Sequence, residues 1–213
     1  DKSGSSDKAE LSWTLAMAVR TRSLWLLELA IILGAAAVPG VTFHQAPVVL
    51  DKGLGVPIAA AAVFIFGIAS GFSKVGFGFL AERIPVQYLF IGCMLGSSGS
   101  LLLLLNADST LMVVAYAVTY GLLRGGFPTL ESVIWADYFG RTSLGTIRGV
   151  SQPFILIARA SGPLVGGVLF DLTKNYDLAI MTFIVMFMVG GLVLIFAPPP
   201  RYPDSVRQAT EGT

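Results

Sequence analysis

Residues 84–107, with the sequence IPVQYLFIGCMLGSSGSLLLLLNA, contain no charged side chain. A transmembrane helix needs about 20 mainly apolar residues to cross the hydrocarbon core of a bilayer, which is about 30 Å thick. Three other uncharged runs of comparable length occupy residues 29–50, 53–73 and 178–200. These four runs predict transmembrane helices and therefore an integral membrane protein.

The composition of the whole chain excludes a soluble domain. Only 13% of the 213 residues are charged and 54% are hydrophobic, whereas soluble domains carry about 25% charged residues. The 14 basic and 13 acidic residues nearly balance, which gives no sign of a nucleic-acid partner. The one cysteine, Cys93, and the one histidine, His44, show no metal-ligand spacing, so we expect neither a metal nor a cofactor.

Two further segments are long and apolar but interrupted by charges. The only charged residues in 109–133 are Arg124 and Glu131, and the only one in 149–170 is Arg159. Polarity does not alternate along any of the runs, which favours helices over the strands of a membrane barrel. The sequence therefore predicts an all-α membrane protein with six transmembrane helices, at 24–50, 57–81, 86–106, 109–133, 146–170 and 177–197.

The basic residues outside the spans predict the orientation of the helices. Short loops make neighbouring helices antiparallel, so alternate loops lie on opposite sides of the membrane. Nine basic residues fall on the side of the termini and two, Lys52 and Lys174, on the other side. The positive-inside rule then places both termini in the cytoplasm of a cell (inner) membrane protein. We expect residues 1–23 to form a cytoplasmic linker with an interfacial helix, 24–197 the bundle, and 198–213 a disordered cytoplasmic tail.

The charges inside the spans suggest that the six helices form two triplets. The middle helix of each triplet holds one deep cation, Lys74 in the first and Arg159 in the second, and the third helix of each holds no charge. Two triplets of opposite topology with matching middle helices are the product of an inverted repeat. We therefore expect two inverted three-helix repeats, with the third helices peripheral and facing lipid; chance placement of the two cations is the alternative.

These two cations are the first candidates for a binding site. An unpaired cation near the bilayer centre costs at least about 2.5–3.5 kcal/mol, and no acid lies within one turn of Lys74 or Arg159 on its own helix. One hypothesis is that both cations line a cavity and bind an anion, most simply a carboxylate; the other is that each pairs with an acid on another helix. Helical spacing adds further candidates for substrate contacts. Ser70 shares a face with Lys74, Gln152 shares one with Arg159, and Tyr116 and Tyr120 share a polar stripe of the fourth span with Arg124.

A second group of charges is a candidate gate or a structural charge network. Arg124 and Glu131 lie two turns apart on one helix face, within reach of each other through a water, and Glu131 and Arg148 lie near the cytoplasmic edge. His44, near the outer end of the first span, is a candidate proton carrier because imidazole exchanges protons near neutral pH. The alternative for His44 is an ordinary hydrogen bond at the membrane edge.

Pairs of glycines four residues apart occur on four of the predicted helices. Such pairs allow two helix backbones to approach closely. The pairs are Gly67/Gly71, Gly92/Gly96, Gly121/Gly125 and Gly162/Gly166. Close helix packing is the role that we expect for all four.

Several stretches go beyond composition and resemble a known family. The sequence GFLAER at 78–83 is similar to the signature loop of the major facilitator superfamily, which runs Gly, any residue, Leu, a small residue, Asp, Arg; here Glu82 replaces the Asp. ADYFGR at 136–141 and GPLVGGVLFD at 162–171 resemble the C-terminal halves of bacterial facilitators. The closest resemblance is to the monocarboxylate and oxalate/formate carrier branch, which residues 13–25 and 42–44 also resemble.

This resemblance implies the C-terminal six-helix half of a twelve-helix secondary transporter that moves a small carboxylate or other organic anion by alternating access. The missing N-terminal half would be its partner, and the start at Asp1 instead of Met agrees with a fragment or a processed product. Lys74 occupies the position of a helix-eight cation implicated in carboxylate binding, and Arg159 approximates one on helix eleven. Ser70 stands where monocarboxylate carriers have an Asp, and Glu82 with Arg83 would latch the cytoplasmic side.

Two other functions fit parts of the sequence. A self-sufficient six-helix protein could dimerise to complete a carrier or a channel. An intramembrane protease could use the sequence GSSG at 96–99, but a rhomboid-like mechanism needs a histidine base on a later helix, and His44 comes earlier. We therefore expect a protein that is not an enzyme.

Overall fold

The computed structural model describes residues 13–140 and 144–200, and all the regular secondary structure in these ranges is helical. Six of its helices are long and apolar enough to cross a membrane, which confirms the six predicted spans. The remaining helix is a single turn before the first span. The helices are α1 (Leu15–Ala18), α2 (Arg22–Asp51), α3 (Val56–Ala81), α4 (Val86–Leu105), α5 (Thr110–Phe139), α6 (Leu144–Thr173) and α7 (Asp177–Ile195).

The ends of α5 and α6 differ from the prediction. Helix α5 continues to Phe139, beyond the predicted end at 133, because the burial of Trp135, Tyr138 and Phe139 stabilises the additional turns. Trp13 packs edge-on against Phe139 at 5.7 Å between ring centroids, which holds the segment before α2 against the end of the bundle. The predicted linker up to residue 12, the tail from residue 201 and the loop at 141–143 lie outside the described residues.

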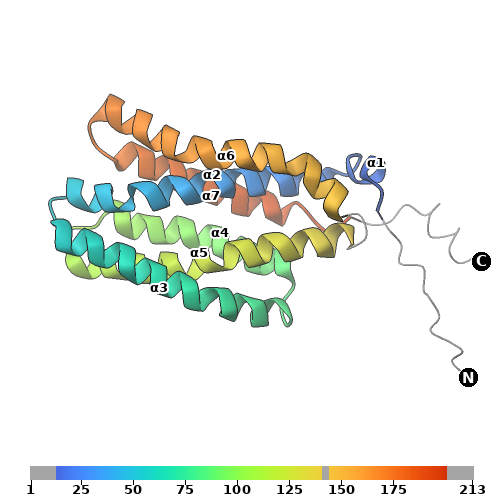
Figure 1. The fold of residues 1–213 in the computed structure, drawn as a ribbon, viewed down its shortest axis with the longest axis horizontal. Helices are drawn as coiled ribbons and strands as arrows, with labels where there is room; N and C mark the ends of the chain where they lie inside the picture. The colour runs from blue at the N-terminus through green and yellow to red at the C-terminus, as the bar shows by residue number, and fades with distance from the viewer. Residues whose placement is uncertain (1–12, 141–143, 201–213) are drawn as a thin grey trace, which may run out of the picture.

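The packing of the helices follows an inverted repeat of two triplets, α2–α4 and α5–α7. Helix α3 packs mainly against α5, and its counterpart α6 packs mainly against α2. Helix α4 packs against α5 and α7 against α2, and α4 and α7 also pack against each other. Exchanging the triplets converts each of these pairs into another, as a twofold axis would. The predicted arrangement of two inverted three-helix repeats is therefore found in the packing (Figure 1).

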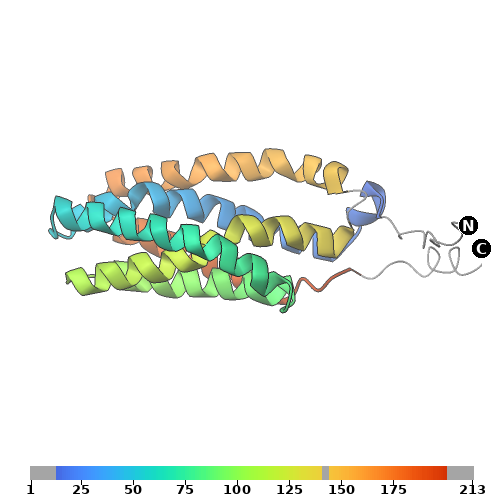
Figure 2. The same cartoon turned by 60° about the horizontal axis from the view of Figure 1, so that its bottom comes forward.

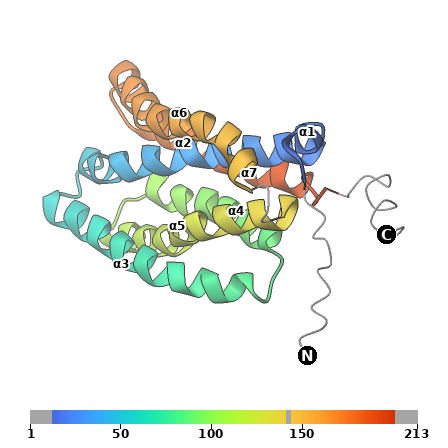
Figure 3. The same ribbon diagram turned by 45° about the vertical axis from the view of Figure 1, so that its right-hand side comes forward.

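The middle helices, α3 and α6, lie on opposite sides of the bundle (Figure 3). They are its least buried helices: only 17% of the most apolar window of α3 and 22% of that of α6 are buried, against 44% for α4 and α7. The cause is that α4 and α7 meet each other, whereas α3 and α6 each have one main neighbour. The expectation that the third helices face lipid stays a prediction, because a partner that covered α3 and α6 would leave α4 and α7 on the outside.

Two of the four glycine pairs lie at close helix contacts. A Cβ atom added to Gly121 would lie 2.8 Å from the carbonyl oxygen of Phe66, and one on Gly162 would run into the carbonyl oxygen of Ala36. These glycines let α5 approach α3 and let α6 approach α2. By contrast, a Cβ on Gly67, Gly71 or Gly92 would have no neighbour within 4 Å among the described residues, so the close packing expected there is not found within this chain.

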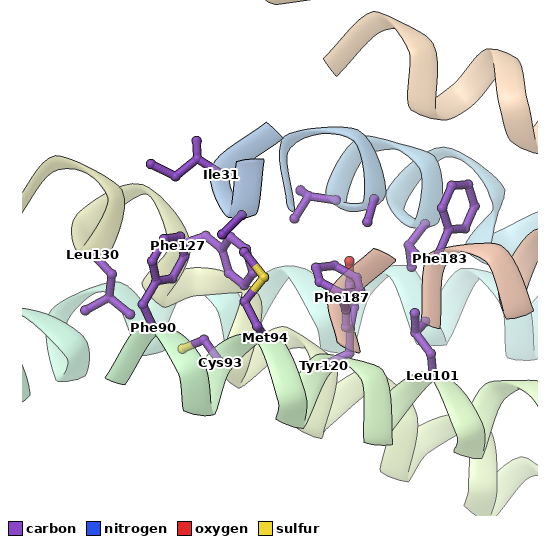
Figure 4. Packing of buried hydrophobic residues seen from close by; sticks show 14 of the residues in the cluster. Ile31, Phe90, Cys93, Met94, Leu101, Tyr120, Phe127, Leu130, Phe183 and Phe187 are labelled. Atoms are coloured by element: carbon purple, nitrogen blue, oxygen red, sulfur yellow. The ribbon is translucent and has the colours of Figure 1, made fainter. Parts of the chain in front are cut away.

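Large aromatic side chains fill the centre of the bundle between α2, α4, α5 and α7 (Figure 4). Phe127 packs edge-on against Phe90 and Phe187, with ring centroids 5.3 Å and 5.9 Å apart, and Tyr120 packs edge-on against Phe187 at 6.2 Å. Edge-to-face pairs of this kind add to the stabilisation from burial. Phe90 and Phe127 of this apolar centre line the same cavity as Arg124 and Glu131 of α5.

Candidate functional site

A cavity of about 420 Å³ opens between α2, α4, α5 and α6. Its wall is mostly apolar, with a few polar groups that converge on the space, which is the usual build of a small-molecule site. The lining residues are Ile31, Gly34, Ala35, Val38, Pro39, Thr42, Phe43, Phe90, Arg124, Phe127, Pro128, Glu131 and Arg159. Two arginines and one carboxylate give this wall a net charge of +1.

Glu131 of α5 is shared by two arginines of α6. Nη2 of Arg159 donates a hydrogen bond of 3.3 Å to Oε2 of Glu131, and Nη2 of Arg148 lies 3.9 Å from Oε1. The Glu131 side chain is 13% exposed, whereas that of Arg159 is 52% exposed. Arg159 therefore has donors left over that face the cavity, since a guanidinium carries five N–H groups.

Arg124 lines the same cavity but forms no ion pair in the described part of the chain. Its Nε atom is buried and makes no hydrogen bond there. Among the described residues, Glu131 forms its direct ion pairs with the two arginines of α6 and not with Arg124, so the water-bridged contact of Arg124 with Glu131 stays a prediction. Arg124 is thus a cation in the cavity wall with unused donors.

Lys74 lies away from this cavity. On α3, the residues that meet α5 include Ala69 and Ser73, whereas Lys74 and Gly71 are exposed on another face. Ser70 is half-buried, and its carbonyl group lies against Gly125 of α5. The structure therefore does not bring Lys74 and Arg159 together on one cavity of this chain.

Tyr116 and Tyr120 of α5, the two tyrosines proposed from the sequence, are fully buried and are not among the cavity-lining residues. The Tyr116 hydroxyl donates to Oε1 of Gln45 on α2 at 3.3 Å, and the Tyr120 ring stacks on the Tyr116 ring at 5.5 Å. The Tyr120 hydroxyl has no hydrogen-bond partner among the residues described. Gln152 of α6 is exposed and does not line the cavity either.

The remaining candidates occupy the ends of the bundle. Nε2 of His44 lies 2.9 Å from the carbonyl oxygen of Pro163 and, because that oxygen only accepts, Nε2 is the donor. His44 thus connects α2 to α6 by a hydrogen bond. This bond agrees with the alternative to a proton carrier, an ordinary hydrogen bond at the membrane edge. Glu82 and Arg83 follow α3, are exposed, and form no ion pair within the described ranges.

Several lining residues were not among the candidates from sequence, notably Thr42 and Phe43 of α2. The two arginines of the wall share a second sequence feature besides their charge. Pro128 follows Arg124 by four residues, and Pro163 follows Arg159 by four. A proline within a helix has no N–H, so it leaves the carbonyl of the residue four positions earlier without its helical partner. Both arginines thus lie at points where the helix ladder is interrupted.

The shared pair at Glu131 leads to a prediction about stability. Replacing Glu131 with Gln is expected to lower the free energy of unfolding by about 1 kcal/mol, a modest loss because both arginines are partly exposed. Double-mutant cycles with Arg159→Gln and with Arg148→Gln measure each pair by itself. The cycle with Arg159 should show the larger coupling, and equal or reversed couplings would contradict the distances.

The sequence matches the model of one protein family, the Major Facilitator Superfamily, over residues 9–213. The chain belongs to the major facilitator superfamily. With its six helices that are long and apolar enough to span a bilayer, this facilitator chain is a multi-pass membrane protein. The match agrees with the signature loop at 78–83 and with the bundle of two inverted triplets.

Relatives of this facilitator chain include several monocarboxylate transporters. Monocarboxylate transporter 12-B of Danio rerio is 28% identical over 159 residues, which cover 71% of this chain and 31% of that protein. Monocarboxylate transporter 12 of Homo sapiens is 27% identical, with 72% of this chain and 29% of that protein covered. Monocarboxylate transporter 10 of Homo sapiens is 27% identical, with 62% and 26% covered. The predicted resemblance to the monocarboxylate branch is confirmed, and the chain aligns with less than a third of each relative.

Proposed function

We propose that this chain is the C-terminal six-helix half of a secondary transporter that moves a small organic anion, most simply a monocarboxylate, by alternating access. The observation that supports this proposal most directly is the cavity wall with two arginines and one carboxylate. We place both termini in the cytoplasm of the cell (inner) membrane, from the distribution of basic residues.

The chemistry of the cavity suits a carboxylate with a small organic body. A guanidinium presents N–H groups in a planar fork that matches the two oxygens of a carboxylate. Arg124 has unused donors, and Arg159 is only partly engaged by Glu131. Phe43, Phe90 and Phe127 would enclose the apolar part of the substrate.

Binding of an anion offers a way to drive the conformational change. An anion that draws Arg159 toward the cavity would compete with Glu131 for the same guanidinium. This exchange would weaken the link between α5 and α6, two helices that otherwise make few contacts with each other. The substrate would thereby favour a different arrangement of the half, as differential binding to two states requires.

The exposed helices α3 and α6 would face the other half of the transporter. Lys74 lies on the exposed side of α3, so it would reach the substrate path from the surface between the halves. Glu82 and Arg83, at the end of α3, would pair with the other half to latch the cytoplasmic side. The alternative is that a second copy of this chain covers the same surface.

Transport assays with the complete transporter test this function. Reconstituted into liposomes, it should exchange radiolabelled lactate or pyruvate across the bilayer and should not exchange the cation choline. Lys74→Ala and Arg159→Ala should each reduce the exchange rate, and the substrate role is wrong if both leave uptake and binding of every anion unchanged. Native mass measurement of this chain by itself distinguishes the alternative, which requires a stable dimer that transports.

A further inference from the structure

Glu28 of α2 is the most unusual charged residue in the part of the chain that the structure describes. It is 5% exposed, and no other Asp, Glu, Lys or Arg described there is buried to this extent. Neither of its carboxylate oxygens has a described partner at full hydrogen-bond geometry, and the Ser151 hydroxyl is the one described polar group near enough for a hydrogen-bonding interaction with it. In the sequence this position lies near the expected cytoplasmic start of a span, where a carboxylate would reach water, so its burial is a finding of the structure.

The described residues around Glu28 supply no counter-charge. A small cavity of about 30 Å³ lies beside it between α1, α2 and α6, and Ser151 is the one polar side chain in its wall besides Glu28. Helix α1 and the residue that follows it present the apolar Leu15 and Val19. The charged group that interacts electrostatically with Glu28 is another acid, Glu131 of α5, and it repels a negative charge on Glu28. Arg148, one turn before Ser151 on α6, is paired with Glu131.

An ionised carboxylate in such a place is strongly disfavoured. Burial without a partner removes the hydration of the charge, and a nearby acid repels it, so the group takes up a proton instead. A protonated carboxyl needs only one acceptor, which the Ser151 hydroxyl or a water can provide. The cavity is large enough to hold a water, since a free space of about 10–15 Å³ is sufficient for one molecule.

We propose that Glu28 is a proton-binding site, neutral in the state seen here and ionised when α1 and α6 move away from it, so that this half carries a proton with its anion. The position suits exchange with the cytoplasm, because α1 covers the end of the bundle where α5 ends and α6 begins (Figure 2). This inference rests on the proposed transport only for the coupling; proton binding by Glu28 stands by itself.

Glu131 connects the proton to the anion site. It acts electrostatically on Glu28 and, at the same time, binds Arg159 in the wall of the large cavity. An anion that draws Arg159 away leaves the charge of Glu131 less compensated, which makes a charge on Glu28 more costly. Anion and proton therefore favour each other's binding, and by linkage the effect is reciprocal. This sign of coupling is that of co-transport in one direction.

The test compares the wild-type transporter with Glu28→Gln, a neutral side chain of the same shape. In liposomes with an inward proton gradient, wild type should accumulate radiolabelled lactate above equilibrium, and E28Q should not. Exchange of labelled for unlabelled lactate at equal pH should persist in E28Q, because this exchange needs no proton release. Asp108→Asn, at an exposed acid between α4 and α5, is the matched control and should behave as wild type.

Infrared spectroscopy gives a readout that does not depend on transport. Wild type and D108N should show the carbonyl stretch of a protonated carboxyl at neutral pH, and E28Q should lack it. Gradient-driven accumulation in E28Q equal to wild type, or an unchanged infrared band, overturns the proposal. If E28Q fails to fold, the infrared spectrum of Glu28→Asp is the test instead. The carbonyl band must then shift, because the protonated group is an aspartic acid in place of a glutamic acid. A wild type that exchanges no anion contradicts the proposed function, and the infrared band then decides proton binding by itself.

Discussion

Replacing both Arg124 and Arg159 with Gln is expected to abolish most of the affinity for a small monocarboxylate. A hydrogen bond to a charged group contributes about 1.5–3 kcal/mol and each 1.4 kcal/mol is tenfold in affinity, so losing both arginines should weaken binding about a hundredfold or more. Both line the same cavity, and no other cation of the described residues is part of its wall. The dissociation constant of radiolabelled pyruvate, measured on the complete transporter in detergent, checks the prediction.

The single variants should differ in stability more than in affinity. Arg124 forms no ion pair in the described residues, so Arg124→Gln removes a binding group and little else. Arg159→Gln also leaves Glu131 without its closer partner, so it should lower both the affinity and the temperature of unfolding. Arg20→Gln, at an exposed position between α1 and α2, is the control and should leave both quantities unchanged. A double variant that binds pyruvate as wild type does would exclude this cavity as the anion site.

The helices were predictable because membrane spans depend on local composition. Uncharged runs long enough to cross the bilayer, together with two runs that hold few charges, predicted all six, and the charge pattern of the middle helices indicated the inverted repeat. The end of α5 was missed because its last turns are stabilised by the contacts of Phe139 with Trp135 and with the distant Trp13. Such contacts leave no periodic signal in the sequence.

The charges of the site were found from sequence, but their partners were not. Helical spacing placed Arg124 and Glu131 on one face of one helix, yet the partner of Glu131 depends on which helix lies opposite, and that helix is α6. Spacing likewise put Tyr116 on this polar stripe, but its hydroxyl meets Gln45 of α2 and not the cavity. Periodicity along one helix identifies a face, and the neighbour of that face is set by tertiary packing.

The contact of α6 with α2 gives the prediction with the largest effect on stability. Gly162→Leu is expected to lower the free energy of unfolding by about 3 kcal/mol, the upper end of the usual cost of overpacking. A Cβ atom at Gly162 would meet the backbone of Ala36, which can move only if α2 and α6 separate. Fluorescence of the tryptophans during unfolding in denaturing detergent measures the loss.

The same substitution should also disturb the anion site. Gly162 lies three residues after Arg159, so a displacement of α6 would carry this guanidinium away from Glu131 and from the cavity. Gly92→Leu on α4 is the matched control, because a side chain there would meet no described residue within 4 Å of its Cβ atom. It should unfold as wild type does and bind pyruvate with the same affinity. Equal unfolding of the two leucine variants would show that the contact between α2 and α6 is not tightly packed, since only one of them places a side chain against a neighbouring backbone.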